Sequence, residues 1–119
     1  MLKTGLSRIE AFEAAMAEAG QHGAVGDARS AFAALERAHV LGQLDFLPHL
    51  RVHWQMLRVG WSAGDWREVI GQVLRLALVP IGHLVGRLPM GNTGGANVSA
   101  FKPMTIPPEL KRLIEERDR

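Results

Sequence analysis

The sequence predicts an all-α fold: an antiparallel four-helix bundle, an irregular C-terminal wrap and a short last helix. In four segments, apolar residues recur every three or four positions, which is the spacing of one face of a helix. Capping residues precede these segments, and the connections are short, which favours antiparallel neighbours. We expect helices near residues 8–19, 28–41, 46–61 and 66–79 of a single domain 1–119, with the bundle over 8–83 and the wrap and last helix over 84–119.

The first two predicted helices begin at recognisable capping residues. Ser7 opens a capping-box pattern, and Gly20 should end the helix that follows. Asp27 is a suitable N-cap for the second helix, and Gly42 is a suitable glycine at its end. His22 is expected in the turn between the two helices, exposed to solvent.

The third and fourth helices are predicted in the same way. Asp45 can cap the third helix, and Pro48 suits its first turn, where a missing N–H costs nothing. Asp65 can begin the fourth helix, and Pro80 should kink or end it. On the fourth helix, the residues expected to face the core are Trp66, Val69, Ile70, Val73 and Ala77, and those expected to face solvent are Glu68, Gln72 and Arg75.

Helical periodicity disappears between Leu84 and Ile106. The stretch 89–97 is rich in turn-forming residues and is expected to be a structural turn rather than an anion cradle. Four spaced apolar residues indicate an ordered wrap over the bundle: Val98, Phe101, Met104 and Ile106. Pro107 then begins the short last helix.

Composition excludes several classes of function. The 119 residues carry a formal charge of +2, which is too weak for a nucleic-acid partner. Cys is absent, so the chain has no thiolate ligand and no disulfide. The most apolar run, 69–85, contains four polar or helix-breaking residues and is not expected to span a membrane. The N-terminus lacks the apolar core of a signal peptide, so we expect a cytoplasmic protein.

A constellation of potential metal ligands flanks the turn between the second and third helices. Glu36 and His39 are three residues apart, and His49 and His53 are four apart, so each pair lies on one helical face. The turn should fold the two helices together, and both pairs can then point into one space. Imidazole and carboxylate suit a transition-metal ion such as Zn, Cu, Fe or Mn. We therefore predict a metal site formed by Glu36, His39, His49 and His53.

Other interpretations of these residues stay open. The four groups can form a structural hydrogen-bonded network in a helical protein-interaction module, since buried polar groups need partners. A metal-dependent enzyme with an open coordination position is a third interpretation. Glu13, Met56 and His83 are further candidates for the site, and a protein partner or a homo-oligomer is possible. A full di-iron site is less suited, because it needs two Glu-x-x-His motifs and the chain has one. Haem ligation by one histidine, with Met56 or another histidine opposite, is a further but unspecific interpretation.

Several short motifs are distributed over nearly the whole chain. They are Leu35-Glu-Arg-Ala-His-Val-Leu-Gly-Gln43, the pair His49 and His53, Gly71-Gln72, Pro89-Met-Gly-Asn-Thr-Gly94 and Pro103-Met-Thr-Ile-Pro107. This set resembles a bacterial family of short proteins catalogued only as a domain of unknown function. Members of that family are associated with gene neighbourhoods for heavy-metal resistance, so the resemblance implies a metal-related role. It implies no particular fold, ligand set or activity.

Overall fold

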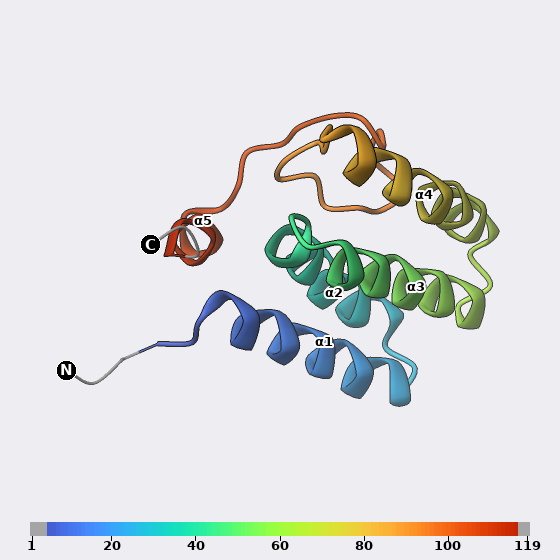
Figure 1. The fold of residues 1–119 in the computed structure, drawn as a ribbon. Helices are drawn as coiled ribbons and strands as arrows, with labels where there is room; N and C mark the ends of the chain where they lie inside the picture. The colour runs from blue at the N-terminus through green and yellow to red at the C-terminus, as the bar shows by residue number, and fades with distance from the viewer. Residues whose placement is uncertain (1–4, 117–119) are drawn as a thin grey trace.

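The computed structural model describes residues 5–116, and this part of the chain contains five helices and no strand. The helices are α1 (Arg8–Ala24), α2 (Ala28–Gly42), α3 (Phe46–Ser62), α4 (Trp66–Val85) and α5 (Pro108–Glu116). Consecutive helices from α1 to α4 pack against one another, and α5 packs on α2 and α1. In Figure 1, α1 and α4 lie on opposite sides of the pair formed by α2 and α3. The predicted all-α class is confirmed.

Two helices are longer than predicted. Helix α1 continues past Gly20 to Ala24, and the chain turns at Gly26, whose φ of +78° favours glycine. His22 therefore lies in the last turn of α1 rather than in a loop, and it is only partly exposed. Helix α4 passes through Pro80 and ends at Gly86, which adopts the left-handed conformation.

The hydrophobic core lies among α1, α2, α3 and α5. Its buried members are Phe12, Ala15, Ala19, Ala34, Leu35, Ala38, Val40, Leu41, Val52, Met56 and Leu110. Many of these side chains are small, so the helices can approach one another closely. At Gly42, for example, an added Cβ would lie 2.6 Å from the Phe12 ring. Met56, named above as a further candidate for the site, is a fully buried member of this core.

An arginine at the start of α1 binds the turn between α2 and α3. The guanidinium of Arg8 donates to the carbonyl of Leu41 at 2.8 Å and pairs with the carboxylate of Asp45 at 2.8 Å. Asp45 occupies the N-cap position of α3, but its side chain makes no capping hydrogen bond there. The predicted cap is therefore replaced by an ion pair that fixes how α3 leaves α2.

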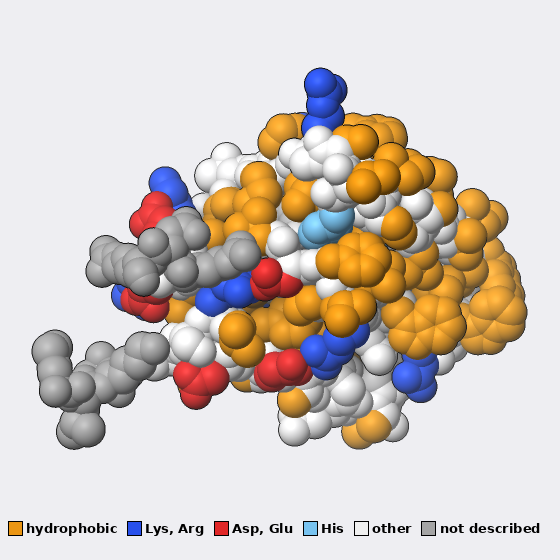
Figure 2. Space-filling view, in the orientation of Figure 1, with side chains coloured by type: hydrophobic (Ala, Val, Ile, Leu, Met, Phe, Trp, Pro, Cys, Tyr) orange, Lys and Arg blue, Asp and Glu red, His pale blue; other side chains and the backbone are white. Residues whose placement is uncertain are grey.

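Helix α4 is oriented opposite to the prediction. Val69 is buried as expected, but Trp66, Ile70, Val73 and Ala77 are exposed. Figure 2 shows hydrophobic side chains gathered over α3 and α4, while the Asp and Glu side chains visible in this view lie toward α1 and α5. By length and composition alone α4 could cross a membrane, with a mean hydropathy of 1.4, and a single helix of this kind is weak evidence for a span.

The inward face of α4 is polar because the segment after it returns along that face. Gln72 and Arg75, expected in solvent, are buried: Gln72 donates to the carbonyl of Gly94, and Arg75 donates to that of Val98. Glu68 accepts the backbone N–H of Ala96 at 2.9 Å. These hydrogen bonds satisfy backbone groups of a segment that has no regular structure of its own.

Polar anchors also hold the rest of the wrap. The Gln43 side chain donates to the carbonyl of Pro89 and accepts from the N–H of Gly91. The buried Asn92 side chain donates to the carbonyls of Ser99 and Lys102. Three of the four predicted apolar anchors are partly buried, but Phe101 is 74% exposed. The wrap thus follows the helices mainly through amide side chains.

Candidate metal centre

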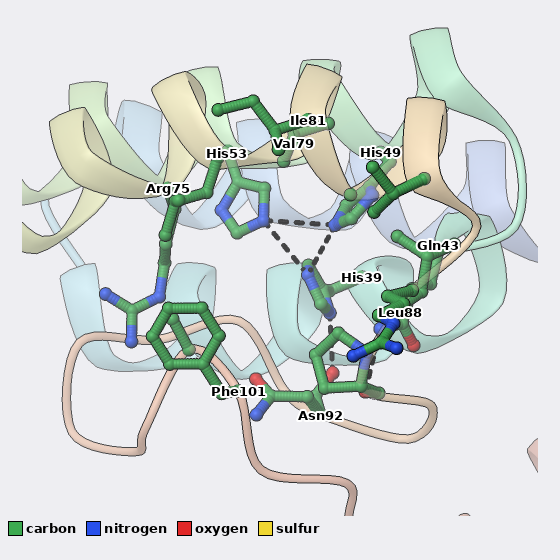
Figure 3. A pocket seen from close by; sticks show the side chains of 16 residues that line it. His39, Gln43, His49, His53, Arg75, Val79, Ile81, Leu88, Asn92 and Phe101 are labelled. Atoms are coloured by element: carbon green, nitrogen blue, oxygen red, sulfur yellow. Dashed lines mark hydrogen bonds between the residues drawn. The ribbon is translucent and has the colours of Figure 1, made fainter.

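Three histidines from two helices converge at the buried end of a cavity (Figure 3). His39 lies in the last turn of α2, and His49 and His53 lie one turn apart on α3. Their exposed fractions are 2%, 4% and 2%. The short connection between Gly42 and Phe46 brings these two helix segments together, as the spacing predicted.

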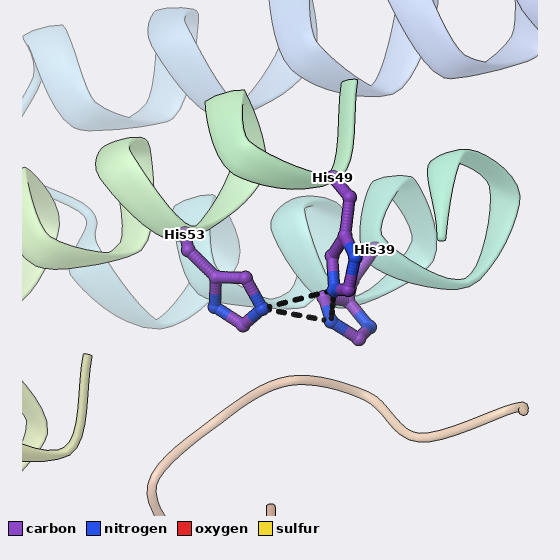
Figure 4. A group of neighbouring side chains, drawn as sticks. All are labelled: His39, His49 and His53. Atoms are coloured by element: carbon purple, nitrogen blue, oxygen red, sulfur yellow. Dashed lines mark hydrogen bonds between the residues drawn. The ribbon is translucent and has the colours of Figure 1, made fainter. Parts of the chain in front are cut away.

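The three rings present the same atom to one another (Figure 4). The Nε2 atom of His39 lies 3.0 Å from that of His53 and 3.0 Å from that of His49. The Nε2 atoms of His49 and His53 are 3.2 Å apart. The three atoms therefore form a nearly equilateral triangle.

Neighbouring acceptors determine the tautomers of two rings. His39 Nδ1 lies 2.6 Å from the backbone carbonyl oxygen of Asn92, so it must carry the proton and donate it. His53 Nδ1 lies 2.7 Å from Oε1 of Gln72, whose amide nitrogen already donates to Glu68 and Gly94. His53 must also donate from Nδ1. Both neutral rings then turn an unprotonated Nε2, with its lone pair, toward the triangle.

The third ring is oriented by a fourth histidine. His49 Nδ1 lies 2.9 Å from Nε2 of His83, a half-buried residue near the end of α4. If His49 donates to His83, its own Nε2 is also unprotonated and three lone pairs converge. If His83 donates to Nδ1 of His49 instead, the proton of the neutral His49 ring lies on Nε2. That single proton is then the only donor for both other rings, and the lone pairs of His39 and His53 still face each other. A hydrogen-bonded network alone therefore leaves this triangle under-satisfied.

The dimensions of the triangle suit a metal ion. Tetrahedral Zn–N bonds of about 2.0–2.1 Å correspond to N···N separations of about 3.3–3.4 Å. The observed separations of 3.0–3.2 Å are within a few tenths of an ångström of that value. In each ring, the second nitrogen is held by a carbonyl, an amide or another imidazole, which is how proteins orient histidine ligands.

Burial keeps these imidazoles neutral. Burial lowers the pKa of His39 well below its usual range, and the adjacent His53 and His49 lower it further. Burial lowers the pKa of His49 to about 3, with His53 and His83 adding to the effect. Burial likewise lowers the pKa of His53 to about 4, against the hydrogen bond to Gln72. At neutral pH all three are in the form that binds a cation.

These pKa shifts predict that the metal-free protein loses stability as pH falls from 7 to 5. The folded pKa values lie below the unfolded value of about 6.5, so in this window the unfolded chain binds more protons. The neutral histidines therefore contribute their full stabilisation above about pH 6.5. As pH falls from about 6.5 toward their pKa values in the folded protein, the free energy of unfolding decreases by up to about 1.4 kcal/mol per pH unit for each histidine. Urea unfolding at each pH measures this free energy of unfolding. The variant His22→Ala should show the same dependence, and a flat profile would contradict the expectation.

The predicted fourth ligand, Glu36, is not among the groups that converge. It lies on the wall of a different cavity, beside Phe32, Gly60 and Glu68. Burial raises the pKa of its carboxyl group, and the charge of Glu68 raises it further. Residues three apart on a helix point about 60° away from each other, and here that angle separates Glu36 from His39.

The other candidate ligands take different roles. Glu13 pairs with Arg51 through two hydrogen bonds of 3.0 and 3.1 Å on the exposed side of the protein. His83 contacts the triangle only through His49. The sequence did not predict that Gln72 and Asn92 would orient the rings of His53 and His39. Nothing in the local sequence around an amide residue on a helix or in a turn indicates which group it will bond to. The Gly71-Gln72 and Gly91-Asn92 motifs were the available hints.

A cavity of about 250 Å³ adjoins the histidines. The three rings form part of its wall, and Val79, Ile81, Leu88 and Phe101 supply apolar surface around them (Figure 3). Two arginines, Arg75 and Arg87, also line it, and no carboxylate of residues 5–116 does. A small molecule or ion that enters this cavity can therefore reach the histidine rings.

Comparison with known proteins places the chain in a family without assigning its activity. No curated protein and no solved structure matches the chain. Residues 7–114 match the family described as "Protein of unknown function (DUF3703)". That match covers α1 to α4, most of α5 and the three converging histidines, so the chain belongs to this family of proteins of unknown function.

Proposed function

We propose that the protein binds one divalent transition-metal ion through Nε2 of His39, His49 and His53, for metal handling or sensing. The observation that supports this most is the triangle of nitrogen atoms, 3.0–3.2 Å apart, of which two are held unprotonated by their neighbours. Buried lone pairs that face one another, as those of His39 and His53 do, repel unless a cation or a proton lies between them. Removing that repulsion is what a bound ion would contribute.

The donor set narrows the choice of metal. All three donors are imidazole nitrogens, which suit Zn, Cu, Fe and Ni, whereas Mn prefers oxygen ligands. Three protein ligands leave a fourth position for water or another ligand, as in open metal sites. The adjoining apolar cavity is where such a ligand would lie. A metal-dependent reaction is a second candidate on this ground, although within the described part of the chain no carboxylate or further histidine lines the cavity as a general base.

Thermal melting of metal-free protein tests the proposal. The protein should be purified without a polyhistidine tag and melted at neutral pH with and without Zn, Cu, Ni, Fe(II) and Mn. An ion that binds only the folded state, present at about 100 times its Kd, adds about 2.7 kcal/mol, or on the order of 10 °C in midpoint. Elemental analysis of protein as purified should find that ion at one per chain. If no ion raises the midpoint, the histidines form a structural network and the proposal is wrong.

A further inference from the structure

One face of the molecule exposes large apolar side chains that the other described residues do not cover. We call it the α3–α4 apolar face and define it by Trp54, Trp61, Trp66, Ile70, Val73, Leu74, Ile81, Leu84 and Val85. Their exposed fractions run from 52% to 86%. The rings of Trp61 and Trp66 meet edge to face across the α3–α4 connection, so the two helices contribute to one surface. Figure 2 shows hydrophobic side chains gathered over both helices.

The face is uncharged over most of α4. Every exposed residue between Ile70 and Val85 is apolar, and the charged or polar residues of this stretch are buried or half-buried. A surface helix normally shows the reverse pattern, with its polar side in water. The polar side of α4 faces the protein instead of solvent, because Gln72 and Arg75 donate hydrogen bonds to the segment 94–98. The apolar side is therefore left without a partner within the described residues.

The spacing on both helices is that of helices that pack along their length. On α3, the exposed and half-buried apolar residues fall alternately three and four apart: Leu47, Leu50, Trp54, Leu57 and Trp61. On α4, the exposed series is Trp66, Ile70, Val73, Ala77 and Leu84. Alternation of three and four residues places side chains along one line of a nearly parallel or antiparallel helix pair.

The area matches what a stable dimer buries. A large side chain offers roughly 200 Å² when fully exposed, so the nine residues present on the order of 1,000 Å². The largest apolar patch on a typical monomer is about 300–600 Å². A standard protein interface buries about 800 Å² on each partner, which this face can supply by itself.

We propose that the α3–α4 apolar face binds the same face of a second copy, so that two helix pairs form a symmetric four-helix interface. A symmetric dimer needs a self-complementary surface. The nine defining residues are uncharged and regularly spaced, which meets that condition. The exposed Arg58 and Arg67 lie within one helical turn of Trp54 and Ile70, at the margin of the face. Most of the interface would lie on the outer side of α4, and Ile81 and Val85 at its end also line the cavity beside the histidines.

A membrane is the other apolar environment that α4 could enter. The hydrogen bonds of its polar side argue against that. To reach lipid as a span, α4 would have to carry Glu68, Gln72 and Arg75, together with the 94–98 segment bonded to them, into the bilayer. A second copy covers the apolar side and leaves all of these contacts intact.

The full chain offers a direct test, because all three of its tryptophans lie on the proposed interface. Light scattering after size exclusion should give twice the chain mass of 13.0 kDa. Dilution through the dissociation constant should shift the tryptophan emission to longer wavelength as the indoles enter water. A monomeric mass at about 100 µM, where even a weak dimer forms, would overturn the proposal. So would flotation of the monomer with phosphatidylcholine or phosphatidylglycerol vesicles.

Matched variants locate the interface. Ile70→Lys, on the face, should weaken dimerisation by at least about 100-fold, because symmetry buries the substitution twice. Ile9→Lys makes the same change at a 62% exposed position on α1 and should leave the dimer unchanged. Both variants should keep the helical circular dichroism of the wild type, since both sites are exposed in the monomer. An Ile70→Lys protein that remains as dimeric as Ile9→Lys would refute the assignment of this face.

Discussion

Replacing His39 by alanine should weaken metal binding by at least about 100-fold, more than loss of an outer-sphere partner typically costs. His39 supplies the corner of the nitrogen triangle that comes from α2, and its Nε2 lies 3.0 Å from both other Nε2 atoms. Without it, two imidazoles one turn apart on α3 remain, and they cannot enclose an ion. Competition with a chromogenic chelator measures the affinity of the metal that raises the melting midpoint.

Two further variants make this prediction specific. His83→Ala removes a ring that contacts the triangle only through Nδ1 of His49, so it should weaken binding by about 10-fold. His22→Ala alters a partly exposed residue on α1, where it pairs with acidic neighbours, and should leave affinity unchanged. If all three variants bind metal equally, the ion is held elsewhere and the triangle is not the site.

Replacing Gly94 by alanine should destabilise the metal-free protein by roughly 2–5 kcal/mol, from backbone strain and overpacking together. Gly94 has a φ of +87°, and an added Cβ would lie 2.5 Å from Cδ2 and 2.8 Å from Nε2 of His39. The His39 ring would have to move away, which breaks its hydrogen bond to the Asn92 carbonyl. Metal affinity should therefore fall with stability. Urea unfolding and chelator competition on the same variant measure both effects.

Gly64→Ala is the matched control for this substitution. Gly64 has a φ of +69°, but an added Cβ would meet nothing within 4 Å. It should show the conformational strain alone, about 1–2 kcal/mol, with metal affinity unchanged. Equal losses of stability in the two variants would show that contact between Gly94 and His39 contributes nothing.

Local sequence signals were sufficient for most of the helices. The Ser7 capping box is present, Asp27 and Asp65 cap α2 and α4, and α2 matches its expected range to within one residue. These features depend on interactions between groups within four residues of one another, so the local sequence is enough to predict them. The end of α1 was missed, because a glycine in an exposed helix weakens it without ending it.

The site was predictable in part for the same reason. His49 and His53 are one turn apart, and a short connection to α2 brings His39 beside them, so the sequence alone indicated their convergence. The support that the wrap gives to His39 was not predictable from the sequence. Asn92 and Gly94 contact His39 from more than fifty positions away, and no local pattern reports such a contact.

What the sequence by itself determined is the all-α class, the position of the helices and the histidines that share the α2–α3 turn. Only the tertiary structure decided which side of α4 faces the protein. The amphipathic pattern of α4 predicted its apolar side inward, because burial of apolar surface usually dominates. In the folded chain, the returning segment 94–98 has backbone groups that require partners, and Glu68, Gln72 and Arg75 supply them. Each of those groups would cost about 1–3 kcal/mol if left unpaired, which favours the polar side inward. The apolar side then faces outward, where the proposed second copy would cover it.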